Sequence, residues 1–170
     1  AHILATEQLA LSRTVASKML RPERRSPNDQ RAFLAEAIAT ARLEHPNIVP
    51  IHDLVRDDHG HLRLVMKRVI GRTWKDLLHP VTRADEAAAD ALELDDHLEF
   101  LLKVCDAVSF AHASGILHRD LKPENVMIGD FGEVLVMDWG CAVTYGDHRF
   151  PGVGHLSDLA TTNGTPTYLA

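Results

Sequence analysis

Ile116–Asn125 brings several reactive side chains close together along the chain. Asp120 is followed by Lys122 two residues later and by Asn125 five residues later. A carboxylate can accept a proton, a lysine ammonium can face a phosphate group, and an amide oxygen can bind a hard cation such as Mg²⁺. The stretch therefore predicts proton transfer close to a phosphate group and a metal ion.

The elements on either side of this stretch would hold it as a rigid loop, and such loops commonly carry function. A helix is predicted from about Leu94 to the Ser114–Gly115 stop, with Asp96 and Glu99 resembling a capping box. A short apolar strand is predicted at 126–128. The apolar residues expected on the core face of the helix are Leu94, Leu98, Leu101, Leu102, Cys105 and Val108.

The N-terminal part of the chain predicts strands and one helix. Alternating apolar residues predict a strand over 14–20. A helix ending near Leu43 follows a proline-containing connection, and its cap is one of Ser26, Asn28 and Asp29. This helix would present an apolar stripe to the sheet.

The middle of the chain predicts a hairpin, a short helix and then a segment of different composition. Strand-like runs at 48–55 and 62–69 are joined by a polar turn. A flexible joint at 69–71 and a short helix near 73–78 come next. Residues 79–93 are rich in alanine and charge and are interpreted as a surface insertion.

Composition sets limits on the class of protein. The chain has 170 residues, 45% hydrophobic and 25% charged, which is typical of one globular domain. A net charge of −6 argues against nucleic acid or an anionic membrane as partner. Two cysteines without CxxC spacing fit a reducing compartment. No signal peptide or long apolar run is present, so we expect a cytoplasmic domain without membrane contact.

Four features stand in a fixed order along the chain: Val15-Ala16-Ser17-Lys18, Glu36, the loop 118–125 and Asp138-Trp139-Gly140. The loop matches the motif H-R-D-L-x-x-x-N at every fixed position. Together they resemble a protein kinase from its third strand through its activation segment, and 164–170 extends the match. The lysine in the loop favours the serine/threonine type, and the motif wording resembles bacterial kinases of the eukaryotic-like (Hanks) type.

The resemblance implies an α+β fold with two lobes, present in part. Residues 1–68 would form a β-rich N-lobe lacking its first strands, and 69–71 the hinge. Residues 72–170 would form a helical C-lobe lacking its later helices, with 138–170 as the activation segment. A Gly-rich loop is absent from residues 1–13 and would lie further upstream. We expect such a piece to expose a large apolar surface.

The resemblance also implies roles for the polar residues. Lys18 would contact the α- and β-phosphates of ATP, and Glu36 would hold Lys18 by an ion pair. Asn125 and Asp138 would bind Mg²⁺. In the loop, Asp120 would orient the substrate hydroxyl. The transferring phosphoryl group would be stabilised by Lys122, and Thr165 would hydrogen-bond close to both loop residues.

The adenine site is implied in the same way. Met66 would be the gatekeeper residue beside the base. The backbone of Lys67 to Val69 would receive the base edge. Ala16 and Met127 would enclose the adenine ring from its two faces.

Each residue alone has a simpler interpretation: Lys18 as a strand-edge charge, Glu36 as a solvated helix charge, Asp138 as a turn residue. Their joint order favours transfer of the ATP γ-phosphate to Ser or Thr hydroxyls of protein substrates, with pairs of kinases able to phosphorylate each other. A pseudokinase typically lacks one of the key polar residues, and all are here. An inactive fragment and a small-molecule phosphotransferase of related fold also stay open.

Arg119 adds a regulatory hypothesis. Kinases with an arginine before the catalytic aspartate commonly use it to bind a phosphate on the activation segment. Ser157, Thr161 and Thr162 are the expected acceptors, with Thr144 a weaker candidate.

Overall fold

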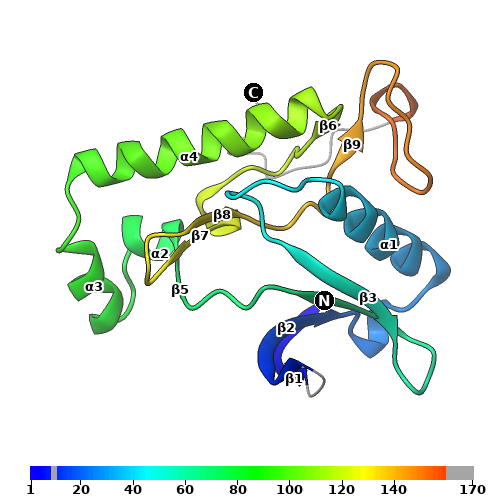
Figure 1. Ribbon diagram of the computed structural model, residues 1–170, viewed down its shortest axis with the longest axis horizontal. Coiled ribbons are helices and arrows are strands. Elements are labelled where there is room, and N and C mark those ends of the chain that lie inside the picture. Colours follow the sequence, from blue (N-terminus) through cyan, green and yellow to red (C-terminus); the bar gives the residue numbers. More distant parts are fainter. Residues whose placement is uncertain (9–10, 160–170) are drawn as a thin grey trace.

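The computed structural model describes residues 1–8 and 11–159 (Figure 1). A four-stranded antiparallel sheet lies at one end of the molecule, with helix α1 (Pro27–Ala41) packed on it. The strand order is β1-β2-β4-β3. The strands are β1 (His2–Gln8), β2 (Arg13–Met19), β3 (Ile51–Arg56) and β4 (Leu62–Met66).

The other end of the molecule is a helical layer crossed by short strands (Figure 1). Its sheet has the order β5-β7-β8, and a second pair joins β6 to β9. Short 3-10 turns occur at Pro22–Arg24, Pro123–Asn125 and Leu156–Asp158. The helices are α2 (Trp74–Leu78), α3 (Arg83–Ala89) and α4 (Leu94–Ala113); the strands are β5 (Gly71–Thr73), β6 (Ile116–Leu117), β7 (Val126–Gly129), β8 (Val134–Val136) and β9 (Val143–Thr144).

Helix α1 begins where its sequence supplies a complete cap. Ser26 is the N-cap, and its side chain accepts from the Asp29 backbone N–H while the Asp29 carboxylate accepts from the Ser26 backbone. Pro27 stands in the first helical turn, where its missing N–H costs nothing. The helix packs Phe33 and Ala37 against Leu64 and other apolar residues of the sheet. One of the three predicted cap residues is thereby confirmed.

Two strand predictions were too long. The strand expected from residue 48 begins at Ile51, because Ile48 instead forms a parallel bridge to Val136 in the second sheet. The strand expected to reach residue 69 ends at Met66. Residues 67–70 connect the four-stranded sheet to β5, and the division of the chain into lobes at this point stays a prediction.

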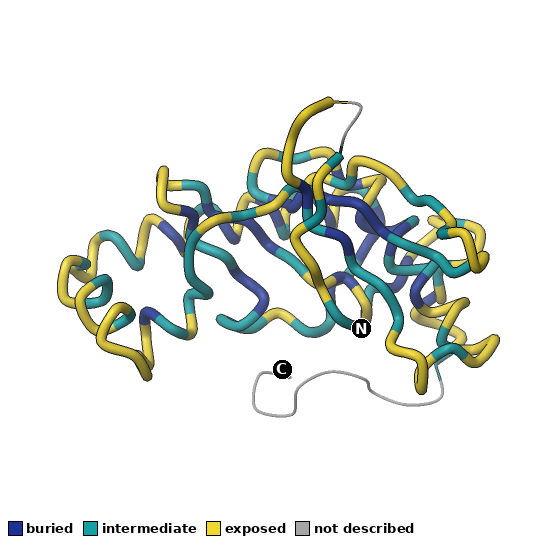
Figure 2. The backbone as a smooth tube through the Cα atoms, turned by 90° about the horizontal axis from the view of Figure 1, so that it is seen from below, coloured by how far each residue is buried: buried dark blue, intermediate teal, exposed yellow. Residues whose placement is uncertain are grey.

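Helix α4 buries a different face from the one predicted. Its buried residues are Phe100, Val104, Ala107 and Ala111, which belong to the main hydrophobic core of the helical layer. Figure 2 shows buried, intermediate and exposed positions alternating along the backbone of the molecule. The predicted stripe lies roughly 100° further around the helix, so both stripes fit the helical period. The residues of that stripe that are exposed are Leu94, Leu98, Leu101, Leu102 and Cys105.

The prediction that Cys105 faces the core was therefore wrong, whereas the expected exposed apolar surface is present on α4. The predicted capping box of Asp96 with Glu99 was also wrong by one turn. The helix instead has Glu93 at its N-cap, and the Asp96 carboxylate accepts from the Glu93 backbone N–H at 2.8 Å.

Residues 79–93, predicted as a surface insertion, fold back onto the helical layer. They contain α3, whose cap is a reciprocal pair between Thr82 and Asp85. Asp85 also accepts a hydrogen bond from Arg72 Nε at 3.1 Å. Ala88 and Leu92 pack against the main core. Within residues 1–8 and 11–159, we find no helix long and apolar enough to cross a membrane.

The connection after α1 fastens the first sheet to the second. Asn47 Nδ2 donates to the Val134 carbonyl at 2.9 Å, and the Asn47 carbonyl accepts from Val136 N–H at 2.8 Å. Val49 N–H in turn donates to the Val136 carbonyl at 3.2 Å. Val134 and Val136 are fully buried, so water cannot replace these bonds.

We expect Asn47→Ala to lower the free energy of unfolding by about 1–3 kcal/mol, because the buried Val134 carbonyl would lose its amide donor. Urea denaturation of the purified variant measures this. Asn28→Ala, at the exposed start of α1, serves as the control and should change stability by less than about 0.5 kcal/mol. Equal effects of the two substitutions would contradict the interpretation.

Candidate active site

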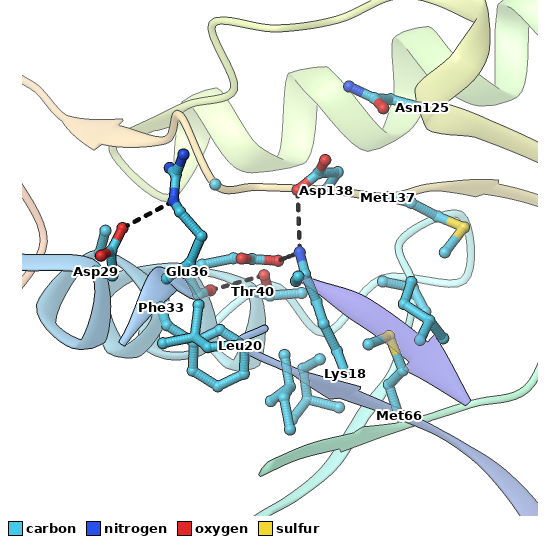
Figure 3. A pocket seen from close by; sticks show the side chains of 18 of the residues that line it. Lys18, Leu20, Asp29, Phe33, Glu36, Thr40, Met66, Asn125, Met137 and Asp138 are labelled. Carbon is cyan, nitrogen blue, oxygen red and sulfur yellow. Dashed lines mark hydrogen bonds and ion pairs between the residues drawn. The ribbon is translucent and has the colours of Figure 1, made fainter. Parts of the chain in front are cut away.

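The centre of the site is an ion pair between the sheet and helix α1 (Figure 3). Lys18 Nζ on β2 lies 2.5 Å from Glu36 Oε1 on α1, and both side chains are largely buried, at 12% and 11% exposure. Lys18 Nζ also lies 3.2 Å from Asp138 Oδ1, whose side chain is 53% exposed. The predicted ion pair between Lys18 and Glu36 is confirmed, and it points toward Asp138.

Burial and charge compete in setting the protonation of this pair. Burial alone would lower the pKa of Lys18, but the carboxylates of Glu36 and Asp138 outweigh it, and the pKa is raised. Lys18 is therefore an ammonium at neutral pH. Burial raises the pKa of Glu36, although the attraction of Lys18 lowers it in turn. The pair is thus held in a poorly solvated place where a lysine charge acts strongly on an approaching anion.

The loop between β6 and β7 folds around its own catalytic candidates. Lys122 Nζ lies 2.8 Å from Asp120 Oδ2. Asn125 Nδ2 donates to the Asp120 carbonyl at 2.8 Å and lies 3.3 Å from Asp120 Oδ2. The amide nitrogen of Asn125 is thereby committed to the loop, which leaves its oxygen as the atom suited to a cation. The structure brings all three predicted loop residues together.

His118 ties this loop to the segment that carries Asp138. Its Nδ1 accepts from the Asp120 backbone N–H at 3.2 Å, and its Nε2 lies 3.0 Å from the Met137 carbonyl. These partners require a neutral ring with the proton on Nε2. The pKa of His118 is lowered, mainly because the ring is buried. Its bond to the Met137 carbonyl and the charges of Asp138 and Asp120 raise the pKa, but by less.

Two non-glycine residues of the site have left-handed backbones. Arg119 has a φ of 67° and Asp138 a φ of 57°. Such conformations are uncommon for residues with a Cβ and persist where the surroundings impose them. Trp139 supplies part of those surroundings, because it is only 1% exposed and its ring lies 4.5 Å from that of His118. Its large ring belongs to the main core.

A cleft of about 520 Å³ adjoins the ion pair. Figure 3 shows Lys18, Glu36 and Asp138 around it, with Asn125 on the opposite side from the sheet. Apolar residues from both ends of the molecule also line it, among them Phe33, Val49, Leu64, Met66, Met127 and Met137.

The adenine residues expected from the sequence are only partly in this cleft. Met66 and Met127 line it, whereas Ala16, Lys67 and Val69 are not among the described residues that do. Ala16 lies directly opposite Met66 in the ladder between β2 and β4. The cavity lies closer to α1 than to residues 67–70, which explains the difference. Their role in adenine binding stays a prediction.

Lys67 also differs from the expectation in one detail. Its backbone N–H donates to the Pro50 carbonyl at 3.0 Å, so its backbone could meet a base only through its carbonyl.

Thr165 and the motif at 164–170 lie outside the described residues, as do Thr161 and Thr162. Ser157 is exposed and lies near Arg149 and His155. Thr144 is fully buried, which makes it a poor acceptor.

Glu124 also lines the cleft, next to Asn125, and was not among the residues predicted from the sequence. Its Oε1 lies 3.0 Å from Lys75 Nζ, while its Oε2 is buried without a hydrogen-bond partner in the described structure. The sequence signal that could have indicated Glu124 was its place inside the loop motif. By itself, a glutamate in a loop is too common to indicate a functional site.

Comparison with known proteins places this arrangement in a family. The model of the protein kinase domain matches residues 3–170. The chain belongs to the protein kinase family. The partial, α+β kinase fold predicted from the sequence is thereby confirmed, with an antiparallel sheet and a helical part.

Individual kinases resemble the chain over most of its length. The serine/threonine-protein kinase PknD of Chlamydia caviae is 36% identical over 175 residues, covering 94% of this chain and 19% of that protein. PknD of Protochlamydia amoebophila is 40% identical over 136 residues, covering 76% of this chain and 14% of that protein. The chain thus spans less than a fifth of the length of these bacterial relatives.

The lowered pKa of His118 predicts a pH-dependent stability contribution. Between its folded pKa and the ordinary value of 6.5, the unfolded chain binds more protons, so stability falls as pH drops through this window. His118→Leu should cost about 1–3 kcal/mol at pH near 7.5, because two hydrogen bonds are lost. The difference from wild type should shrink toward pH 5.5 in urea denaturation. A difference that grows on acidification would contradict this.

Proposed function

We propose that this chain carries the nucleotide site and catalytic loop of a protein kinase that transfers the γ-phosphate of ATP to Ser or Thr hydroxyls. The observation that carries the proposal is the convergence of Lys18, Glu36, Asp138 and Asn125 on one cleft. The printed names of the bacterial relatives, all serine/threonine-protein kinases, support the acceptor class.

The donor set suits Mg²⁺. Asn125 and Asp138 line the same cleft from neighbouring segments and offer amide and carboxylate oxygens, the hard ligands that this ion prefers. Magnesium in proteins usually takes one or two such ligands and completes its shell with phosphate oxygens and water. When bound there, it would neutralise charge between the phosphates of the nucleotide.

The protein's own residues then divide the remaining work. Lys18, kept charged by its two carboxylate neighbours, would bind phosphate oxygens and orient the nucleotide. Lys122, beside Asp120, would place a second cation near the transferred group. Asp120 would accept a hydrogen bond from the substrate hydroxyl and align its oxygen with the phosphorus atom. The reaction is thereby accelerated mainly by positioning and charge.

Partners and location follow only in part. Membership of the family supports a protein substrate. Pairing of two copies for mutual phosphorylation stays a prediction, as does a cytoplasmic site. Thr165 also keeps its predicted role near Asp120 as part of this proposal.

The decisive test is Asp120→Ala in the purified protein, assayed with radiolabelled ATP, Mg²⁺ and a generic protein substrate. We expect kcat to fall on the order of 10²–10⁴-fold, because the hydroxyl loses its proton acceptor. Asp58→Ala, in the exposed β3–β4 turn, is the matched control and should keep the wild-type rate.

Three outcomes would count against the proposal. Equal rates for Asp120→Ala and the wild type would refute the role of Asp120. Nucleotide binding by the wild type without transfer would indicate a pseudokinase. Transfer to small hydroxyl compounds but not to proteins would indicate a small-molecule phosphotransferase.

A further inference from the structure

Residues 67–70, which connect the four-stranded sheet to β5, are held by the turn between β7 and β8. The Asp130 backbone N–H donates to the Ile70 carbonyl at 3.0 Å, and Gly71 lies opposite Gly129 in the β5–β7 ladder. A Cβ on Gly71 would lie 2.1 Å from the Ile128 carbonyl oxygen, so the two backbones meet as closely as glycine allows. The C-terminal end of residues 67–70 is thus attached to this turn.

The N-terminal end of the same connection is attached to the same turn through side chains. Lys67 Nζ lies 3.0 Å from Glu133 Oε1, with the two side chains 37% and 33% exposed. The hydrogen bond from Lys67 lowers the pKa of Glu133, which keeps the carboxylate charged at neutral pH. Neither residue is among the described residues that line the cleft.

Gly129 makes room for this ion pair. A Cβ at residue 129 would lie 2.2 Å from Glu133 Oε2 and 2.9 Å from its Cδ, so the glutamate side chain lies directly across the glycine. The atoms in conflict belong to the end of a flexible side chain. A larger residue at 129 would therefore displace the Glu133 carboxylate rather than prevent folding.

We propose that Lys67 and Glu133 are positioning residues for the nucleotide: their ion pair holds residues 67–70 against the β7–β8 turn in the conformation that receives the adenine base. This inference rests on the proposed ATP-dependent function. With attachments at both ends, the backbone of Arg68 and Val69 has few conformations to lose when a base binds, which favours binding. Without the pair, only the Ile70 end would stay attached to the turn among the contacts described.

The first test is Glu133→Gln, which removes the charge and keeps the shape. An exposed ion pair of this kind contributes modestly, so we expect the Kd and KM for ATP to rise about two- to fivefold with kcat changed less than twofold. Glu99→Gln is the matched control, because it breaks the exposed Glu99–Lys103 pair on α4 and should leave all three values unchanged. Fluorescence titration with a labelled adenine nucleotide gives Kd without requiring turnover.

A merely structural role is separated by salt and by rescue. Raising the salt concentration from about 0.05 M to about 0.5 M screens exposed charges, so the ratio of variant to wild-type Kd should approach one. Each single charge reversal, Lys67→Glu or Glu133→Lys, should raise the Kd for ATP. The double variant that carries both reversals restores an ion pair and should return the Kd most of the way to the wild-type value.

Gly129→Ala tests the same contact without altering a charge. It should raise the Kd for ATP about as much as Glu133→Gln, and the double variant should be no worse than either single one, since both act on one ion pair. Hydrogen exchange of the amides at residues 68–70 should accelerate in both single variants.

The outcomes separate this inference from the proposed function. If the wild type binds and uses ATP but Glu133→Gln and Gly129→Ala bind it with wild-type affinity, the positioning role is overturned and the function stands. Independent, additive effects of the two substitutions would also overturn it. If the wild type neither binds nor uses ATP, both proposals fail together.

Discussion

The site depends on one charged contact, the ion pair of Lys18 with Glu36. It joins β2 to α1, and therefore the position of the helix decides where the lysine charge lies. Helix α1 in turn packs Phe33 and Ala37 against the sheet on one side. At the C-terminal end of α1, the guanidinium carbon of Arg42 lies 4.2 Å from the centre of the Phe150 ring, which packs on the main core. The geometry of the ion pair thus depends on two hydrophobic clusters: the one between α1 and the four-stranded sheet, and the main core of the helical layer.

Burial gives that pair its strength and also a cost. The pKa of Glu36 is raised by burial, so removing this carboxylate from water is not fully repaid by Lys18 in the described structure. The Asp138 carboxylate, at 3.2 Å, gives Lys18 a second anion. Phosphate oxygens bound beside Lys18 would add a further one. A lysine surrounded by anions in a poorly solvated cleft suits electrostatic work better than it suits stability.

The sequence predicted the fold well where local chemistry and distant packing agree. Ser26 and Asp29 cap α1 as short polar residues before a helix should, and the loop at 118–125 could be placed from its motif. The prediction failed on α4, where two apolar stripes fit one helical period and only tertiary packing selects Phe100 and Val104 over Leu101 and Cys105. The ion pair of Lys67 with Glu133 spans 66 residues of sequence, so no local pattern could indicate it.

His118 explains how the catalytic loop and Asp138 keep a fixed relation to each other. Asp120, which follows Arg119, donates its backbone N–H to Nδ1 of the His118 ring. Nε2 of the ring donates to the carbonyl of Met137, which precedes Asp138. Arg119 and Asp138 are the described non-glycine residues of the site with left-handed backbones, so the imidazole holds the chain beside each of them. Trp139 packs on the same ring and excludes water from both bonds. A neutral, buried histidine can thus hold two strained segments in register without taking part in the chemistry, because strain of this kind persists only where the surroundings fix the backbone on both sides.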